Sequence, residues 1–227
     1  MNLKILLLTI VAVAAAAQTP VESRPEIGPK LKQNAEALRQ YSYKRRTQIT
    51  IDGQPRATRV DLVRYINGQE ETVPLEAPER PSGQGRGGGL RGRMIQKKKE
   101  EMKEDVARLT SLLHRYMSPG SDSMRAALEK AAISRTGPEP DADIQLTAKG
   151  VVDPSDSMTL TWSVARKRPE KIAIHAKLDG KPVDLAVNFA ALPEGPFYAA
   201  HTVVSAPKHD LVVNIDTFDY ERGEAGR

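Results

Sequence analysis

The part of the chain after Pro140 most constrains the fold, because short segments with alternating apolar residues follow one another closely there. The segments that we predict to be β-strands are Ile144 to Ala148, Ser157 to Val164, Lys171 to Leu178, Val183 to Phe189, Phe197 to Ser205 and Leu211 to Phe218. Several links between them are brief, for example residues 165–170 and 179–182. Parallel neighbours need a crossover of about a dozen residues, so we expect an antiparallel sheet.

The alternation predicts that this sheet has one apolar face, because successive side chains of a strand point to opposite sides. The residues expected on that face are Met158, Leu160 and Trp162 in one strand, Ile172 and Ile174 in the next, and Leu185, Val187 and Phe189 in the third. An apolar face has to be covered, and the helical segments upstream are the expected cover.

Those upstream helices are predicted between residues 94 and 135. Apolar residues recur seven apart from Ile95 to Tyr116, which predicts a helix from Met94 to Met117, and a shorter helix should follow from Ser121 to Ser134. An α+β fold is therefore expected, in which helices cover an antiparallel sheet.

Residues 30–68 are expected to add a helix and two or more strands. Apolar spacing predicts a short helix from Lys30 to Tyr41. Alternating residues then lead into the turn dipeptides Asp52-Gly53 and Asn67-Gly68, which predict a hairpin or meander. We expect residues 30–227 to form one domain.

The N-terminal residues have the three parts of a secretory signal: Lys4, an apolar run from Ile5 to Val13, and small residues up to Ala17. We expect residues 1–17 to be a cleaved signal peptide and residues 18–29, rich in Pro and polar groups, to be a flexible arm. The chain has no cysteine, so an exported form must hold together by packing without disulfides. The expected location is the bacterial periplasm, with an extracellular location as the alternative.

A segment rich in Gly and Pro, residues 76–92, is predicted to be a disordered loop. It leads into a cationic cluster formed by Arg91, Arg93, Lys97, Lys98 and Lys99. The segment can be a plain connector, or the cluster can contact an anionic membrane surface, where each charge contributes about 1 kcal/mol. We expect no nucleic-acid binding, because export removes the protein from nucleic acid and no aromatic residues interleave with the arginines.

Ordinary catalytic and metal-binding motifs are absent from the sequence, so neither a cofactor nor a metal is expected and an enzyme is not favoured. His201 and His209 could meet across a hairpin, but ordinary surface histidines explain them better. Residues 205–208 match the S-x-x-K pattern, yet Pro207 places them in a turn and not on a helix. A hydrolase whose Ser, His and Asp meet only in three dimensions is the remaining catalytic alternative.

A short helix runs into a Tyr-bearing strand (LKQNAEALRQYSYKRRTQITI), a helical insertion follows, and an antiparallel run closes with LVVNIDTFDY. This order of elements resembles the periplasmic lipoprotein-carrier superfamily, which includes the outer-membrane lipoprotein-sorting carrier. The resemblance implies a curved sheet forming half a barrel, a helical lid, and an apolar concavity that shields acyl chains. The Gly-rich basic loop, the long charged helix and an aromatic content of only 4% depart from the family pattern. Residues 157–195 also resemble uncharacterised exported bacterial proteins.

The resemblance favours a non-catalytic carrier or chaperone for a lipid, an acylated protein or another apolar ligand. Its ligand surface would consist of Met158, Leu160, Trp162, Ile172, Ile174, Leu185, Val187 and Phe189, although each alone is more often ordinary core. The alternative is a cell-envelope interaction or scaffold module with a filled core, whose basic loop contacts acidic partners or anionic lipid. Neither the ligand nor the oligomeric state follows from the sequence.

Overall fold

A computed structural model describes residues 24–75, 97, 100, 104–112, 115–116, 122–139, 141–193, 195–207 and 210–223. The expected signal peptide and the Gly-rich loop at 76–92 lie outside these residues. Of the cationic cluster, only Lys97 is described. Arg91, Arg93, Lys98 and Lys99 lie outside the described residues.

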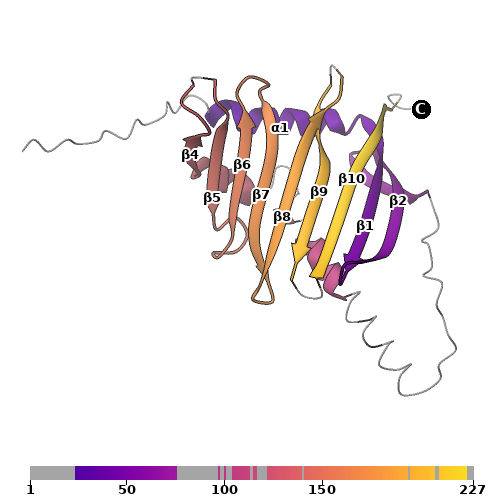
Figure 1. Ribbon diagram of the computed structural model, residues 1–227. Helices are drawn as coiled ribbons and strands as arrows, with labels where there is room; N and C mark the ends of the chain where they lie inside the picture. Colours follow the sequence, from indigo (N-terminus) through magenta and orange to yellow (C-terminus); the bar gives the residue numbers. More distant parts are fainter. Residues whose placement is uncertain are drawn as a thin grey trace, which may run out of the picture.

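The described strands form one ten-stranded sheet, open at both edges and curved (Figure 1). The strands are β1 Tyr41–Ile51, β2 Gln54–Ile66, β3 Gln69–Pro74, β4 Ala132–Arg135, β5 Ile144–Lys149, β6 Ser157–Ser163, β7 Arg168–Leu178, β8 Lys181–Ala191, β9 Phe197–Ala206 and β10 Leu211–Arg222. Their order across the sheet is β3-β2-β1-β10-β9-β8-β7-β6-β5-β4, and every neighbouring pair is antiparallel. The pairing of β1 with β10 joins the N-terminal meander to the C-terminal one.

Three of the hairpins turn at a dipeptide that ends in glycine. Asp52-Gly53, Asn67-Gly68 and Asp179-Gly180 all have positive φ at both positions, from 51° to 78°. Two-residue turns of this kind match the twist of the flanking strands, and glycine adopts the second conformation without a Cβ penalty. The turns predicted from the first two dipeptides are therefore confirmed.

The six C-terminal strands predicted from alternation are confirmed, but two upstream boundaries were wrong. The helix expected to reach Ser134 is α3, Asp122–Glu129, and Ala132–Arg135 is strand β4. The backbone of β4 pairs with β5, with Ala132 opposite Thr147 and Arg135 opposite Ile144. Sheet pairing therefore overrides a weak local helix preference.

The first helix, α1, spans Arg24–Leu38, so the arm expected over 18–29 is helical from residue 24 onward. Pro29, which contributed to the prediction of a loop, lies inside this helix. Ile27, however, is buried in the main hydrophobic cluster, and that tertiary burial stabilises the additional turn.

Helical segments pack on one face of the sheet, which we call the inner face. Side chains from α1 (Ile27), from helical residues 104–112 and 115–116 (Leu109, Tyr116) and from α3 (Leu128) belong to the same hydrophobic cluster as the strands. Figure 1 shows α1 and the helical segments on the far side of the sheet in that view. The opposite face, which we call the outer face, carries mostly polar side chains.

Candidate functional site

The strand register aligns the apolar residues of the inner face in rows that cross the sheet. In one row, the Leu160 row, residues lie directly opposite one another on successive strands from β6 to β2: Leu160, Ile172, Val187, Thr202, Ile215, Thr47 and Arg59. A parallel row contains Met158, Ile174, Leu185, Val204, Val213 and Ile49. One register thus connects the C-terminal strands with the N-terminal meander.

The eight residues predicted as a ligand surface share the inner face of three adjacent strands, β6, β7 and β8. Six of them are buried, namely Met158, Leu160, Trp162, Ile174, Leu185 and Val187. Ile172 and Phe189 are partly buried and pack against the same cluster. The structure therefore brings all eight together as one apolar surface.

Helical residues 104–112 and 115–116 fill the space over the middle of this surface. Leu109, Leu112 and Tyr116 lie over Ile174 and Leu185, and the hollow that remains measures about 10 Å³. Such a volume holds about one water molecule. The inner face is therefore filled here by the chain's own side chains.

Tyr116 holds this segment to the sheet through a buried hydrogen bond. Its hydroxyl donates to Asp156, whose carboxylate also accepts backbone N–H groups of Val151, Val152 and Asp153 at 2.7, 2.9 and 2.8 Å. Burial, followed by the bond to Asp156, raises the pKa of Tyr116. Burial alone would raise the pKa of Asp156, but these hydrogen bonds outweigh it and lower that pKa. The pair is thus a neutral phenol bonded to a charged carboxylate at neutral pH.

A second attachment lies at the turn between β7 and β8. Arg108 bonds Asp105 at 2.6 Å and lies 3.5 Å from the carboxylate of Asp179. Beside it, a hollow of about 100 Å³ separates Leu109 from the hairpin ends, where Leu178 and other apolar side chains line it. Ligand pockets usually measure about 300–1,000 Å³, so a larger ligand needs residues 104–112 and 115–116 to move.

Burial along the Leu160 row decreases toward β2. Val187 is 0% and Thr202 4% exposed, Ile215 and Thr47 are half-buried, and Arg59 is exposed. Along this row, the inner face is therefore covered over β6–β9 and becomes exposed at Arg59, whereas the nearby inner-face residues Ile51 and Val63 are buried.

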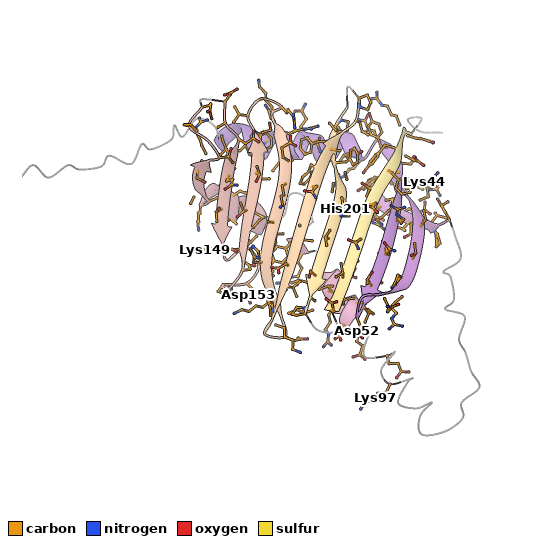
Figure 2. The ribbon with its side chains drawn as sticks, in the orientation of Figure 1. Lys44, Asp52, Lys97, Lys149, Asp153 and His201 are labelled. Carbon is orange, nitrogen blue, oxygen red and sulfur yellow. The ribbon has the colours of Figure 1, made fainter. Side chains whose placement is uncertain are left out.

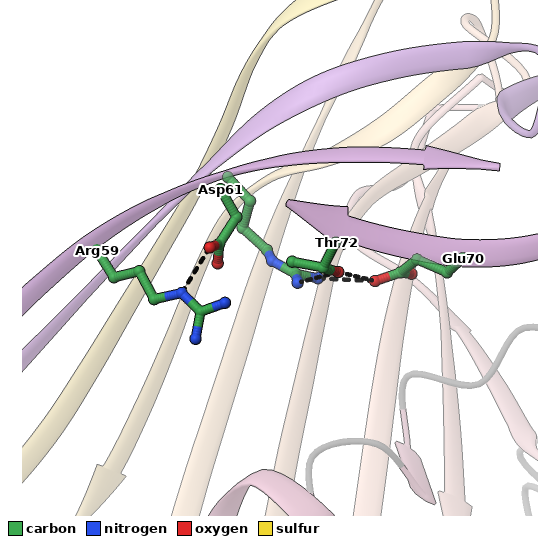
Figure 3. Close-up of polar contacts among 5 residues, drawn as sticks. Arg59, Asp61, Glu70 and Thr72 are labelled. Atoms are coloured by element: carbon green, nitrogen blue, oxygen red, sulfur yellow. Dashed lines mark hydrogen bonds and ion pairs between the residues drawn. The ribbon is translucent and has the colours of Figure 1, made fainter. Parts of the chain in front are cut away.

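At this open end, the inner face becomes polar (Figure 3). Arg59 Nε donates to the Asp61 carboxylate at 2.5 Å, and only 5% of the Asp61 side chain is exposed. The neighbouring Arg45 donates to Glu70 at 3.1 Å and to Thr72 at 3.2 Å. Two guanidinium groups and two carboxylates therefore lie together on strands β1–β3.

Tyrosines flank this polar group. The rings of Tyr43 and Tyr220 stack with centroids 4.8 Å apart, and the ring centroids of Tyr198 and Tyr220 lie 4.3 Å apart. Burial raises the pKa of Tyr220 to about 12, so its hydroxyl is neutral at physiological pH. The sequence analysis missed both the polar group and the tyrosines. Arg59, Asp61, Val63 and Tyr65 are every second residue of β2 and therefore share one face, and this pattern could have indicated that the inner face becomes polar there.

The described histidines pair with aspartates. His175 lies 2.6 Å from Asp184, and His201 (Figure 2) lies 2.7 Å from Asp216. His209, the other member of the hairpin pair considered above, lies outside the described residues. Within the described part of the chain, no group of three side chains could hold a metal ion.

On the outer face of the sheet, a serine, a histidine and an aspartate lie opposite one another on three adjacent strands. Ser157 lies opposite His175 in the register, and His175 lies opposite Asp184. Across the described residues, however, Ser157 makes no hydrogen bond with His175, and both His175 and Asp184 are largely exposed. The row lacks the nucleophile–base contact that hydrolysis requires.

Lys97, the one described residue of the cationic cluster, is helical, exposed and remote from the sheet (Figure 2). Among the described residues, no helix combines the length and apolar character that crossing a membrane requires.

No family model matches the sequence, and no curated protein matches it. Comparison with solved structures gives three likenesses. A domain described as belonging to an outer membrane lipoprotein-sorting protein from Vibrio parahaemolyticus has a TM-score of 0.45 and 10% identity, over 90% of this chain and 95% of that one. A DUF1329 family protein from Desulfovibrio piger has a TM-score of 0.46 and 11% identity, over 92% and 95%.

The third likeness is to a LolA superfamily protein from Nitrosomonas europaea, with a TM-score of 0.31 and 10% identity, over 87% of this chain and 95% of that one. Two of these three structures have descriptions that name the lipoprotein-sorting or LolA class. Because the identities are low and every TM-score is below 0.5, the function has to be argued from the chain's own residues.

Proposed function

We propose that this protein is a non-catalytic periplasmic carrier, which holds the apolar part of a lipid, an acylated protein or another apolar ligand against the inner face of β6–β8. The observation that carries the proposal is the Leu160 row, a line of facing side chains that leads without a break from a solvent-exposed end to a fully buried one. A chain-like ligand that enters at β1 and β10 would follow this row inward.

Entry of a ligand would require residues 104–112 and 115–116 to move outward, because Leu109, Leu112 and Tyr116 fill the inner face. Leu109 and Tyr116 would leave Ile174 and Leu185, and ligand methylenes would replace their contacts. Burying about ten methylenes at about 0.8 kcal/mol each gives about 8 kcal/mol before ordering costs. A dissociation constant in the micromolar range at best is therefore expected.

The proposed ligand surface consists of Met158, Leu160, Trp162, Ile172, Ile174, Leu185, Val187 and Phe189. In the closed form these residues form the core under the helical segment, and in the loaded form they would contact the ligand. Met158 and the other five buried residues have both roles in this proposal.

A second candidate function is a cell-envelope interaction module, and the filled inner face favours it. A hollow of about 10 Å³ under Tyr116 is what a permanently packed core would leave. The cationic cluster at residues 91–99 would then provide the contact with an acidic protein or anionic lipid.

Mass spectrometry of the protein purified gently from its native host distinguishes the two candidates. Co-purified lipid or acylated peptide, together with saturable uptake of a fluorescent fatty acid, supports the carrier. A clean mass of the protein alone, combined with no uptake, would exclude the carrier and leave the interaction module.

A further inference from the structure

At the exposed end of the Leu160 row, the guanidinium of Arg59 is held on one edge by Asp61. We propose that Arg59 binds the acidic headgroup of a single-chain amphiphile, such as a fatty acid carboxylate, whose chain lies along the Leu160 row. This inference rests on the proposed carrier function and specifies the class of ligand.

The contact with Asp61 orients Arg59 for such binding. The Asp61 side chain is 5% exposed and takes the Nε edge of the guanidinium, whereas 49% of the Arg59 side chain is exposed. The two Nη groups of Arg59 make no hydrogen bond with any residue that the structure describes. A guanidinium fixed on one edge and open on the other presents paired donors to a carboxylate or phosphate.

Arg45 is less suited to this role, although it lies on the adjacent strand. Both of its Nη groups are engaged, one with Glu70 and the other with Thr72. The carboxylates of Asp61 and Glu70 are each paired with a guanidinium group. An approaching anion therefore meets the Nη edge of Arg59, which faces away from Asp61. Arg45 contributes positive charge nearby, but each of its Nη groups already has a partner.

The distance from Arg59 to the buried part of the Leu160 row matches the length of an alkyl chain. Four strand-to-strand steps lead from Arg59 through Thr47, Ile215 and Thr202 to Val187. At about 4.8 Å per step, this path is about 19 Å long. A headgroup at Arg59 would therefore place a long alkyl chain over the row and its end near the fully buried Val187.

The test compares cis-parinaric acid with the alcohol of the same chain at pH 8, in the wild type, R59Q and R64Q. Arg64 is the matched control, because it lies on the same strand, has a similarly exposed side chain (47%) and bonds Glu71 on the outer face. Because a hydrogen bond to a charged group is worth about 1.5–3 kcal/mol, the wild type should bind the acid about ten-fold tighter than the alcohol. R59Q should lose this preference, and R64Q should retain it.

Binding of the alcohol reports whether each variant still has a folded apolar surface, so loss of structure in R59Q would be recognised. R59K provides a second variant and should recover part of the preference. If R59Q keeps the ten-fold preference, or if the wild type binds acid and alcohol equally, the headgroup inference is wrong while the carrier function stands. If the wild type binds neither probe, the proposed carrier function fails, and the inference fails with it.

Discussion

Replacing Tyr116 by Phe removes one hydroxyl from a side chain that is 2% exposed, and with it the hydrogen bond to Asp156. A hydrogen bond to a charged group contributes about 1.5–3 kcal/mol. Asp156 keeps its three backbone N–H donors in the variant, so the lower end of this range applies. We expect a decrease of about 1.5 kcal/mol in the free energy of unfolding at pH 7.

The pH dependence of this decrease tests its cause. The pKa of Asp156 in the folded protein is lowered, so its stabilising effect is present above the unfolded value of about 3.9 and is lost as the pH falls through the folded value. The difference between the wild type and Y116F should therefore be full at pH 7 and shrink in strong acid. Urea unfolding followed by circular dichroism at both pH values measures it.

Tyr198 provides the matched control. It is half-buried and packs on Tyr220, and its hydroxyl makes no hydrogen bond with the described residues. Y198F should change the free energy of unfolding by less than about 0.5 kcal/mol. Equal losses in Y116F and Y198F, or a loss in Y116F that is the same in strong acid, would refute the proposed role of the Tyr116–Asp156 bond.

Three further changes test other parts of the account. Leu160→Ala should lower the free energy of unfolding by about 2–5 kcal/mol in urea titrations, because the side chain is buried core, and a loss under 1 kcal/mol would contradict that role. Gly180→Ala should cost about 1 kcal/mol or more, since φ is 76° there, and an unchanged melting temperature would argue against this turn. If the cationic cluster contacts anionic lipid, replacing Arg91, Arg93 and Lys97 to Lys99 by Gln should abolish binding to anionic vesicles in sedimentation assays. Unchanged binding, or no binding by the wild type, would show that the cluster is only part of a connector.

The strands could be predicted from sequence because their signals are local. Period-two alternation fixes which side of β8 carries Leu185 and Val187, and Asn67-Gly68 fixes a turn, without reference to distant residues. The eight apolar positions were therefore assigned correctly to one face.

Other features depend on pairing between distant segments. Nothing local indicates that β1 pairs with β10, and only that pairing aligns Thr47 with Ile215 and extends the Leu160 row to Arg59. The same holds for β4, which is a strand because β5 offers an edge, and for the first turn of α1, which Ile27 stabilises through burial. The headgroup end of the candidate site was thus not visible in the sequence.

Photo-crosslinking with a fatty acid that carries a diazirine near the end of its chain tests the central claim most directly. The account predicts that peptide mapping finds the label on inner-face residues of the Leu160 row, chiefly Val187, Thr202 and Ile172. Their strand neighbours Ala186 and Val203 point to the outer face and should remain unlabelled. Label on these outer-face residues, or no saturable label on the sheet, would contradict the claim that the inner face holds the ligand.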